Sequence, residues 1–173
     1  MTIRSRCQRL RFGRLPGSVL ESILERAETP REARTAAIAL ADGRADRALA
    51  LTEEGAADAL LSTAMRIDEV AERGVPGEIV SVAEDIARNA SIPEVMDALS
   101  TFYRDVASAA LGLGDDSLAF RHRAERVRER SHTLSAERAA AACERIRTLE
   151  DLFRFNANKE IWLGHLIADL SRA

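Results

Sequence analysis

The chain carries an apolar side chain at every third or fourth position between residues 95 and 109, and this repeat constrains the fold more than any other feature. The spacing places its members on one face of an α-helix, where they can be buried together. The members are Val95, Leu99, Phe102, Val106 and Ala109. Just upstream, Ser91 and Glu94 have the spacing of a capping box, and Pro93 suits a first helical turn. The sequence therefore predicts a long helix that opens at residue 91 and ends at the glycine-rich segment 112–114.

Shorter apolar repeats predict further helices on both sides of this one. Before residue 55, three short helices are expected, starting near Pro16, at Pro30 and after Gly43. Their expected inward residues are Val19, Ile23, Leu24 and Ala27, then Ala33, Ala37, Leu40 and Ala41, then Ala45, Leu49 and Leu51. Longer helices are expected at 56–73, 78–90, 116–131 and 134–155 and from Asn158 onward. Gly74 and Asn158 are expected to cap the helices beside them.

The change from short to long helices falls at residues 52–56, Thr-Glu-Glu-Gly-Ala. It divides the chain into a three-helix unit at residues 15–54 and a unit of about five to six helices at residues 56–173. Residues 8–12 alternate weakly and could form a short strand, but no second strand is available to satisfy its backbone groups. We therefore expect an all-α protein in two parts, preceded by a short segment at residues 1–14.

Composition describes an ordinary globular protein, with 46% hydrophobic residues, 31% charged residues and a formal net charge of −3. A net charge of this sign does not call for nucleic acid as a partner. Arginine is concentrated at residues 4–14 and 121–130, and the second patch is interpreted as a solvated helix face. Cys7 and Cys143 are isolated and lack metal-ligand spacing, which fits a reduced, cytoplasmic setting. The apolar runs are too short to cross a bilayer, and no apolar stretch of a signal peptide follows the basic N-terminus.

The N-terminal patch contains five arginines and no acidic residue within its first fourteen positions. At its centre stands Ser5-Arg6-Cys7, which resembles the Ser-Arg-Cys motif of clamp-loader subunits, the AAA+ machines that open a sliding clamp for replication. Three further stretches resemble the delta-prime family of the bacterial DNA polymerase III clamp loader, in matching order and spacing. They are residues 40–49 with a Gly-x-x-x-Arg-Ala-Leu element, residues 99–106 with an Arg-Asp pair, and residues 152–158 before the last helix.

The resemblance implies a function in DNA replication. The chain is similar to the C-terminal portion of a delta-prime subunit, so residues 1–14 would end an ATPase domain, residues 15–54 would form its lid, and residues 56–173 would form the collar that holds subunits in a ring. Arg6, with Ser5 and Cys7 of the motif, would reach the ATP site of a neighbouring subunit as an arginine finger. A guanidinium suits this task because its forked N–H groups match the oxygens of a transferring phosphoryl group.

The implied partners follow from the same resemblance. They are the gamma/tau and delta subunits, contacted through the collar, and indirectly the sliding clamp and primer–template DNA. ATP and Mg²⁺ would be bound by the partner subunits. The resemblance implies no contact with a membrane.

The sequence lacks the parts needed to bind ATP by the family's mechanism. No Gly-x-x-x-x-Gly-Lys-[Ser/Thr] loop occurs, and the sole lysine, Lys159, follows an asparagine. We therefore expect no cofactor and no metal bound by this chain itself. ATP-binding relatives carry an arginine three residues after the glycine of the lid element, where this chain has Asp46 and places Arg47 one position later. This difference favours a non-hydrolysing delta-prime-like subunit over the alternative, a gamma/tau-type subunit.

A second alternative is a small helical DNA-binding regulator. Residues 16–48 could form a helix-turn-helix, with the basic N-terminus as an arm. Against this alternative, the third short helix is mixed in charge, whereas a recognition helix should present Arg, Lys, Asn or Gln on one face.

Several residues with reactive side chains favour structural roles. His122, His132 and His165 have no metal-ligand spacing, and no nucleophile–base pair supports an enzyme with its own active site. The adjacent pair Arg104 and Asp105 is interpreted as a source of a salt bridge to another helix. Cys143 and Trp162 are expected to pack against neighbouring helices.

Overall fold

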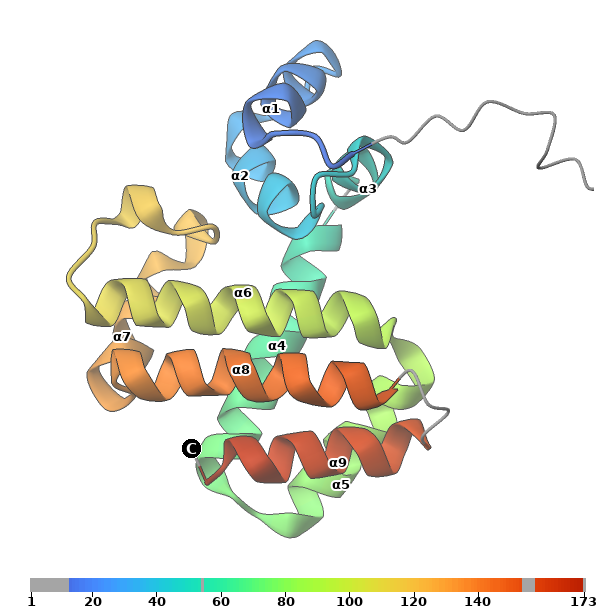
Figure 1. Ribbon diagram of the computed structural model, residues 1–173, viewed down its shortest axis with the longest axis vertical. Helices are drawn as coiled ribbons and strands as arrows, with labels where there is room; N and C mark the ends of the chain where they lie inside the picture. Colours follow the sequence, from blue (N-terminus) through green and yellow to red (C-terminus); the bar gives the residue numbers. More distant parts are fainter. Residues whose placement is uncertain (1–12, 54, 154–157, 173) are drawn as a thin grey trace, which may run out of the picture.

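The computed structural model describes residues 13–53, 55–153 and 158–172, apart from the side chains of residues 32 and 150–153. All regular structure in these residues is helical, so the all-α prediction is confirmed for the described chain (Figure 1). The α-helices are α1 (Gly17–Arg26), α2 (Arg31–Leu40), α3 (Ala45–Leu51), α4 (Ala56–Arg73), α5 (Pro76–Asn89), α6 (Ile92–Ala110), α7 (Ala124–Thr133), α8 (Ala136–Phe153) and α9 (Lys159–Leu170). Two single-turn 3₁₀ helices, η2 (Asp115–Ser117) and η3 (Arg121–Arg123), precede α7. None of the described helices is both long and apolar enough to cross a bilayer.

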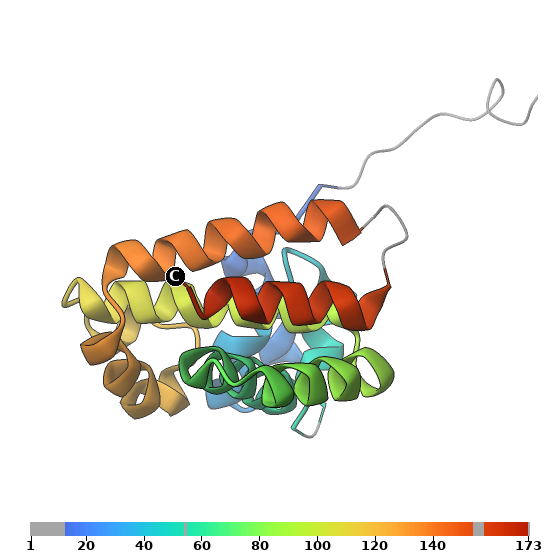
Figure 2. The ribbon, with the colours of Figure 1, turned by 90° about the horizontal axis from the view of Figure 1, so that it is seen from below.

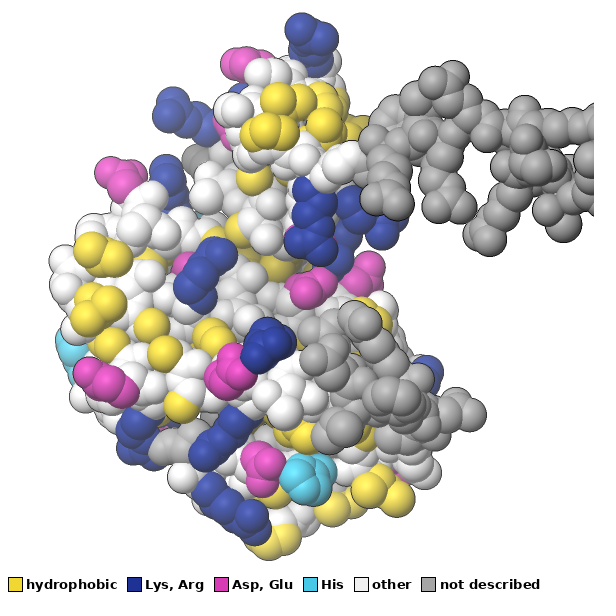
Figure 3. All heavy atoms as spheres, in the orientation of Figure 1, with side chains coloured by type: hydrophobic (Ala, Val, Ile, Leu, Met, Phe, Trp, Pro, Cys, Tyr) yellow, Lys and Arg dark blue, Asp and Glu magenta, His cyan; other side chains and the backbone are white. Residues whose placement is uncertain are grey.

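Helices α1–α3 form a small unit, called here the first bundle. Its core consists of Leu20, Leu24, Ala36, Ala37, Leu40, Ala41, Ala48 and Leu51. Three predicted inward residues are wrong, because Val19 and Leu49 are each 40% exposed, and Ala27 is exposed as well. On these short helices the neighbouring positions Leu20 and Ala48 are buried instead. Figure 3 shows apolar side chains gathered on the surface of this bundle.

Helices α4–α9 form the second bundle, built around α6. Helix α6 contacts α4, α7 and α8, and α9 packs across α4, α5 and α8 (Figures 1 and 2). The predicted face of α6 is confirmed, since Val95, Leu99, Phe102 and Val106 are at most 1% exposed. Fully burying such side chains contributes about 1.5–3 kcal/mol each. The repeat recognised in the sequence is therefore the centre of the second bundle.

Local signals at helix ends gave mixed results. Gly74 ends α4 with a φ of 64°. The Asn158 side chain caps α9 by accepting hydrogen bonds from the N–H groups of Glu160 and Ile161, at 2.9 and 3.3 Å. Both predicted caps are therefore confirmed. The predicted capping box before α6 is wrong, because the Ser91 side chain accepts no capping hydrogen bond. Pro93 lacks an N–H and thereby removes one of the donors that a capping hydroxyl usually binds.

The predicted helix at residues 116–131 is wrong in its first half. The chain instead forms η2, a short buried segment at residues 118–120, η3 and then α7. The N–H groups of Ala119 and Phe120 donate to the Asp105 carboxylate at 3.1 and 2.9 Å. Because these donors bind a side chain of α6, they cannot bind helical carbonyls, and the helix is delayed to Ala124.

The two bundles touch. Helix α2 contacts α4 and α6, and apolar residues of both bundles belong to one continuous core. The connection between α3 and α4 ends at Gly55, whose φ of 77° is a left-handed conformation that favours glycine. The first bundle thus sits directly on α4 and α6 of the second (Figure 1).

Candidate functional site

The candidate arginine finger, Arg6 with Ser5 and Cys7, lies outside the described residues, as does the possible strand at residues 8–12. The structure does describe the point from which this segment departs. The backbone N–H of Leu15 donates to the carbonyl of Gly43 at 2.8 Å, and Arg14 forms an ion pair with Asp42. The chain before residue 14 therefore leaves from the turn between α2 and α3.

Gly43 is required at this junction for two reasons. Its φ is 75°, and a Cβ built on it would lie 2.5 Å from the Cβ of Arg14, closer than real Cβ contacts allow. Gly43 is also the glycine of the Gly-x-x-x-Arg-Ala-Leu element recognised in the sequence. Its identity is therefore explained by the close approach of the incoming chain.

Replacing Gly43 with alanine should lower the free energy of unfolding by about 1–3 kcal/mol, because the left-handed conformation is strained and Arg14 must move. Urea unfolding followed by fluorescence of the single tryptophan would measure it. The matched control is Gly55→Ala, which shares the positive φ of 77° but has open space around the added Cβ. Equal losses in the two variants would show that the contact with Arg14 contributes nothing.

Two arginines of the same element have different partners. Arg44 forms a bidentate hydrogen-bonded pair with Asp46, at 3.3 and 2.6 Å, and this pairing lowers the pKa of the Asp46 carboxyl. Arg47 donates to Asp97 of α6 at 2.7 Å and so links the first bundle to the second. Asp46 thus lies beside Arg44, and Arg47, one position later, lies against α6.

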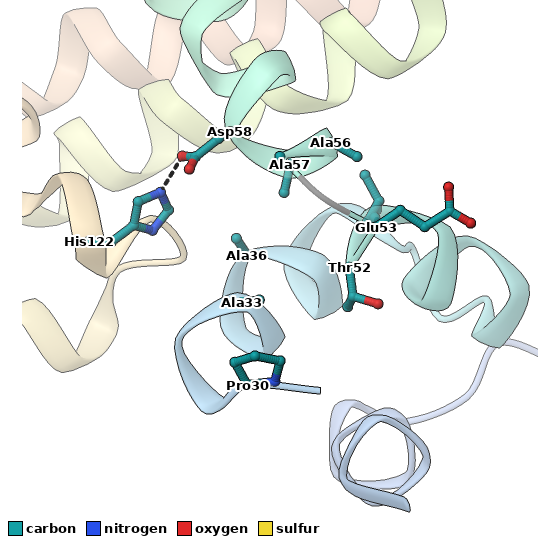
Figure 4. Close-up of a pocket in the computed structure, with 11 residues that line it drawn as sticks. Pro30, Ala33, Ala36, Thr52, Glu53, Ala56, Ala57, Asp58 and His122 are labelled. Atoms are coloured by element: carbon teal, nitrogen blue, oxygen red, sulfur yellow. Dashed lines mark hydrogen bonds and ion pairs between the residues drawn. The ribbon is translucent and has the colours of Figure 1, made fainter. Parts of the chain in front are cut away.

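A cavity of about 270 Å³ lies between the first bundle and the start of α4 (Figure 4). Small apolar side chains form much of its wall, among them Pro30, Ala33 and Ala36. At one side His122 pairs with Asp58 through a contact of 2.7 Å between Nε2 and Oδ1. The Thr52 hydroxyl, which also lines the cavity, donates to the Leu49 carbonyl at 2.7 Å. The described residues around this cavity therefore include no hydroxyl bound to His122, and they form no nucleophile–base pair.

The basic residues of the second patch lie at the surface and are also paired with acidic residues. Along α4, the carboxylates of Asp58, Asp68, Glu69 and Glu72 meet His122, Arg123, Arg126 and Arg130 of η3 and α7, at distances of 2.7 to 3.9 Å. Arg121 and Arg128 pair with Asp116 and Asp115 of η2, at 3.6 and 3.2 Å. Arg121, Arg123 and Arg128 are about half exposed, which agrees with a solvated face, whereas the Arg130 side chain is only 11% exposed and departs from that interpretation. Much of the positive charge of this patch forms ion pairs with carboxylates of the same chain.

These ion pairs include a buried network that the sequence analysis missed. Asp68 of α4 is 1% exposed and accepts a hydrogen bond from the Tyr103 hydroxyl at 2.9 Å. Arg130 donates to both of its oxygens, from Nε at 2.8 Å and from a terminal nitrogen at 3.1 Å. Burial raises the pKa of the Asp68 carboxyl, and Arg130 opposes this increase. Burial likewise raises the pKa of Tyr103 well above its ordinary value. The network joins α4, α6 and α7.

The sequence position of Asp68 indicates that its carboxylate is buried. It lies four residues after Ala64 and three before Ala71, both of which are buried on the same face of α4. A carboxylate on an apolar helix face must have partners, since burying an unpaired charge is very costly. The sequence could therefore have predicted a paired acid here, although not which arginine pairs with it.

The Arg104–Asp105 pair differs from the prediction. Asp105 is fully buried and binds the backbone of residues 119–120, while Arg104 lies 3.7 Å from it on the same helix. Burial raises the pKa of Asp105, and the two backbone N–H groups oppose the increase. Asp105 therefore orders the loop after α6 and makes no salt bridge to another helix among those described.

Cys143, Trp162 and His165 each have a partner within the protein. The Cys143 thiol donates to the Ser100 carbonyl at 3.4 Å, and the Trp162 indole donates to the Leu149 carbonyl at 2.8 Å, which confirms Trp162 as a packed residue. His165 lies 3.4 Å from Asp169. Within the described ranges, no group of three or more His, Cys, Asp or Glu side chains could hold a metal ion.

Comparisons with known proteins found no match to a protein-family model, to a curated protein or to a solved structure. The family resemblance therefore remains a hypothesis drawn from four stretches of the sequence.

Proposed function

We propose that this chain acts as a non-hydrolysing, delta-prime-like subunit of the DNA polymerase III clamp loader. In this proposal the first bundle is the lid and the second bundle is the collar through which the chain joins the gamma/tau and delta subunits. Arg6 supplies an arginine finger to a neighbour's ATP site. ATP and Mg²⁺ belong to that neighbour, the sliding clamp and primer–template DNA are reached through the assembled loader, and the setting is cytoplasmic.

The observation that carries the proposal is the linkage between the two most informative motifs. The segment that bears Ser5-Arg6-Cys7 leaves the described chain at Arg14 and Leu15, which lie against Gly43 of the lid-like element. Arg47 of the same element binds Asp97 on α6. Contacts at Arg47 and Gly43 thus connect the second bundle, through the first, to Arg14, which lies eight residues after Arg6 in the sequence.

The motif arginine and the Arg-Asp pair also support the proposal. Arg6 is the type of residue that phosphoryl transfer requires in trans. Asp105 of the Arg-Asp pair has a defined task, since it fixes the loop after the central helix of the second bundle. Gly43, Asp105 and Asn158 belong to the stretches that carry the resemblance. Each of the three residues therefore has a structural reason to occur at its position.

The DNA-binding alternative is less favoured. Its recognition helix would be α3, which has only seven residues. Arg44 and Arg47 at that helix are paired with Asp46 and Asp97, and the second basic patch is paired with α4 and η2. Phosphate binding would have to displace these carboxylates, because nucleic-acid affinity depends on free Lys and Arg side chains.

Co-elution with the collar of the gamma/tau subunit tests the proposed assembly. When the full chain and that collar are mixed at about 10 μM each, a shared peak of higher mass is expected in size-exclusion chromatography, because ring subunits associate through their collars. The matched control is a mixture of the chain with an unrelated helical protein of similar size. Separate elution of the chain and the collar would contradict the proposed function.

A further inference from the structure

The cavity of about 270 Å³ between the first bundle and α4 has room for a small organic molecule (Figure 4). Its walls are largely apolar, because small side chains from both bundles face it. The apolar lining residues are Pro30, Ala33, Ala36, Leu51, Ala56 and Ala57. A cavity of about 150 Å³ with apolar walls is large enough to hold benzene. This cavity can therefore accommodate one six-membered ring with a short substituent.

One carboxylate oxygen at this cavity accepts no hydrogen bond. Asp58 lines the cavity, and its contacts with His122 at 2.7 Å and with Arg123 at 3.9 Å both involve Oδ1. Within the described part of the chain, no N–H or O–H group donates to Oδ2. A carboxylate has about four acceptor sites on its two oxygens. The pairing with His122 therefore leaves acceptor capacity on Asp58 and holds this side chain beside the cavity.

The charges around the cavity favour a cationic ligand. Glu53 also lines the cavity and is exposed, and Figure 4 shows its carboxylate extending away from the Asp58–His122 pair. Arg123 is 49% exposed, so water and salt screen its charge. An anion in the cavity would be repelled by two carboxylates. An ammonium group, by contrast, could donate a charge-assisted hydrogen bond to Oδ2 of Asp58.

We propose that this cavity binds small primary amines that carry an apolar ring or a short apolar chain. The ammonium group donates to Oδ2 of Asp58, and the apolar body packs against Ala33, Ala36 and Ala57. Because such a ligand contacts α2 and α4 at once, its binding holds the first bundle against the second. The site does not depend on the proposed clamp-loader function, so either proposal can fail without affecting the other.

A titration of the full chain with benzylamine at neutral pH, followed by ¹H–¹⁵N NMR, tests the site. Benzylamine joins a phenyl ring to an ammonium group through one CH₂, so it has both features that the cavity requires. The amide resonances of Ala33, Ala36 and Ala57 should shift and saturate with a Kd on the order of 1 mM, which is reasonable for a ligand of about eight non-hydrogen atoms. Benzoate, which has the same ring but a negative charge, should cause no saturable shift of these resonances.

Two substitutions separate the role of charge from the role of space. Asp58→Asn keeps the size of the side chain and removes its charge, so it should weaken benzylamine binding about tenfold. It should leave the binding of benzyl alcohol, the neutral analogue, nearly unchanged. Ala33→Leu should weaken the binding of both molecules, because the added atoms occupy the cavity. Neither side chain is fully buried, so both variants should fold.

Asp116→Asn is the matched control for charge. Asp116 is a fully exposed acid on η2 and does not line the cavity, so this change should leave the Kd of benzylamine unaltered. The absence of saturable shifts at the three alanine amides up to about 10 mM benzylamine would overturn the proposal. Equal binding of benzoate and benzylamine, or a Kd for benzylamine that Asp58→Asn leaves unchanged, would overturn it as well.

Discussion

Replacing Arg130 with methionine is expected to lower the free energy of unfolding by about 3–5 kcal/mol, the usual cost of breaking a buried ion pair from one side. Methionine keeps much of the apolar volume but removes both hydrogen bonds to Asp68, whose side chain is 2% exposed. The carboxylate and the Tyr103 hydroxyl would remain buried with the positive charge gone. Urea or thermal unfolding of the two chains would measure the loss.

Arg128→Met is the matched control for this prediction. Arg128 lies on the same helix and pairs with Asp115 at 3.2 Å, but both side chains are more than half exposed. Exposed pairs of this kind contribute about 0–1 kcal/mol. A loss for Arg130→Met no larger than that for Arg128→Met would mean that the buried network does not hold α4 and α7 together.

The pH dependence gives a further check on the Asp68–Arg130 pair. Arg130 lowers the pKa of Asp68 against the effect of burial, so its removal should raise this pKa further. A carboxyl whose pKa is higher in the folded than in the unfolded chain stabilises the fold at low pH, and this contribution is lost as the pH rises through the folded pKa. The difference in stability between the original chain and Arg130→Met should therefore shrink as the solution is made acidic. A difference independent of pH would argue against an uncompensated Asp68 charge.

Local sequence signals predicted much of the second bundle. The apolar repeat of α6 spans about four turns, and each position that it marks is buried or partly buried because one long helix cannot choose another apolar face. Asn158 and Gly74 were equally reliable, since a cap depends on residues within one turn of it. Elements set by neighbours in sequence were thus predictable.

Contacts between distant residues explain the failures. The helix expected from residue 116 starts at Ala124 because Asp105, on the preceding helix, binds the amides of Ala119 and Phe120. Helix α1 has two neighbouring rows of apolar residues, and the sequence of α1 does not show which row is buried. Packing against α2 and α3 buries Leu20 and Leu24, whereas Val19 stays exposed. The ion pairs between α4 and α7 join residues far apart in the sequence, as in Arg130 with Asp68. No pattern within one helix specifies such pairings.

The effect of Arg6→Ala on ATP hydrolysis is the largest change that we expect. Arginine fingers supplied in trans increase the rate of phosphoryl transfer by roughly 10³ to 10⁵ in other systems, because they neutralise charge that develops on the transferring group. In a reconstituted clamp loader, the ATP site that receives Arg6 should therefore lose about 10³-fold in hydrolysis rate. Arg6→Lys should rescue little of this loss, since an ammonium lacks the planar, forked donors of a guanidinium.

Arg9→Ala is the control for general effects of charge. It removes the same charge three residues away and outside the Ser-Arg-Cys motif. It should leave hydrolysis nearly unchanged, because a charge outside the motif is expected to contribute little beyond screened attraction. A similar loss for Arg6→Ala and Arg9→Ala would assign the effect to the basic patch as a whole.

The clamp-stimulated ATPase rate of the loader assembled with the original chain or with Arg6→Ala tests the central claim most directly. Both chains should be incorporated equally, as judged by size-exclusion chromatography before the assay. The proposed function predicts that the Arg6→Ala loader loses hydrolysis at the one site that receives the residue, while assembly is retained. Equal ATPase rates for the two loaders would contradict the assignment of Arg6 as an arginine finger.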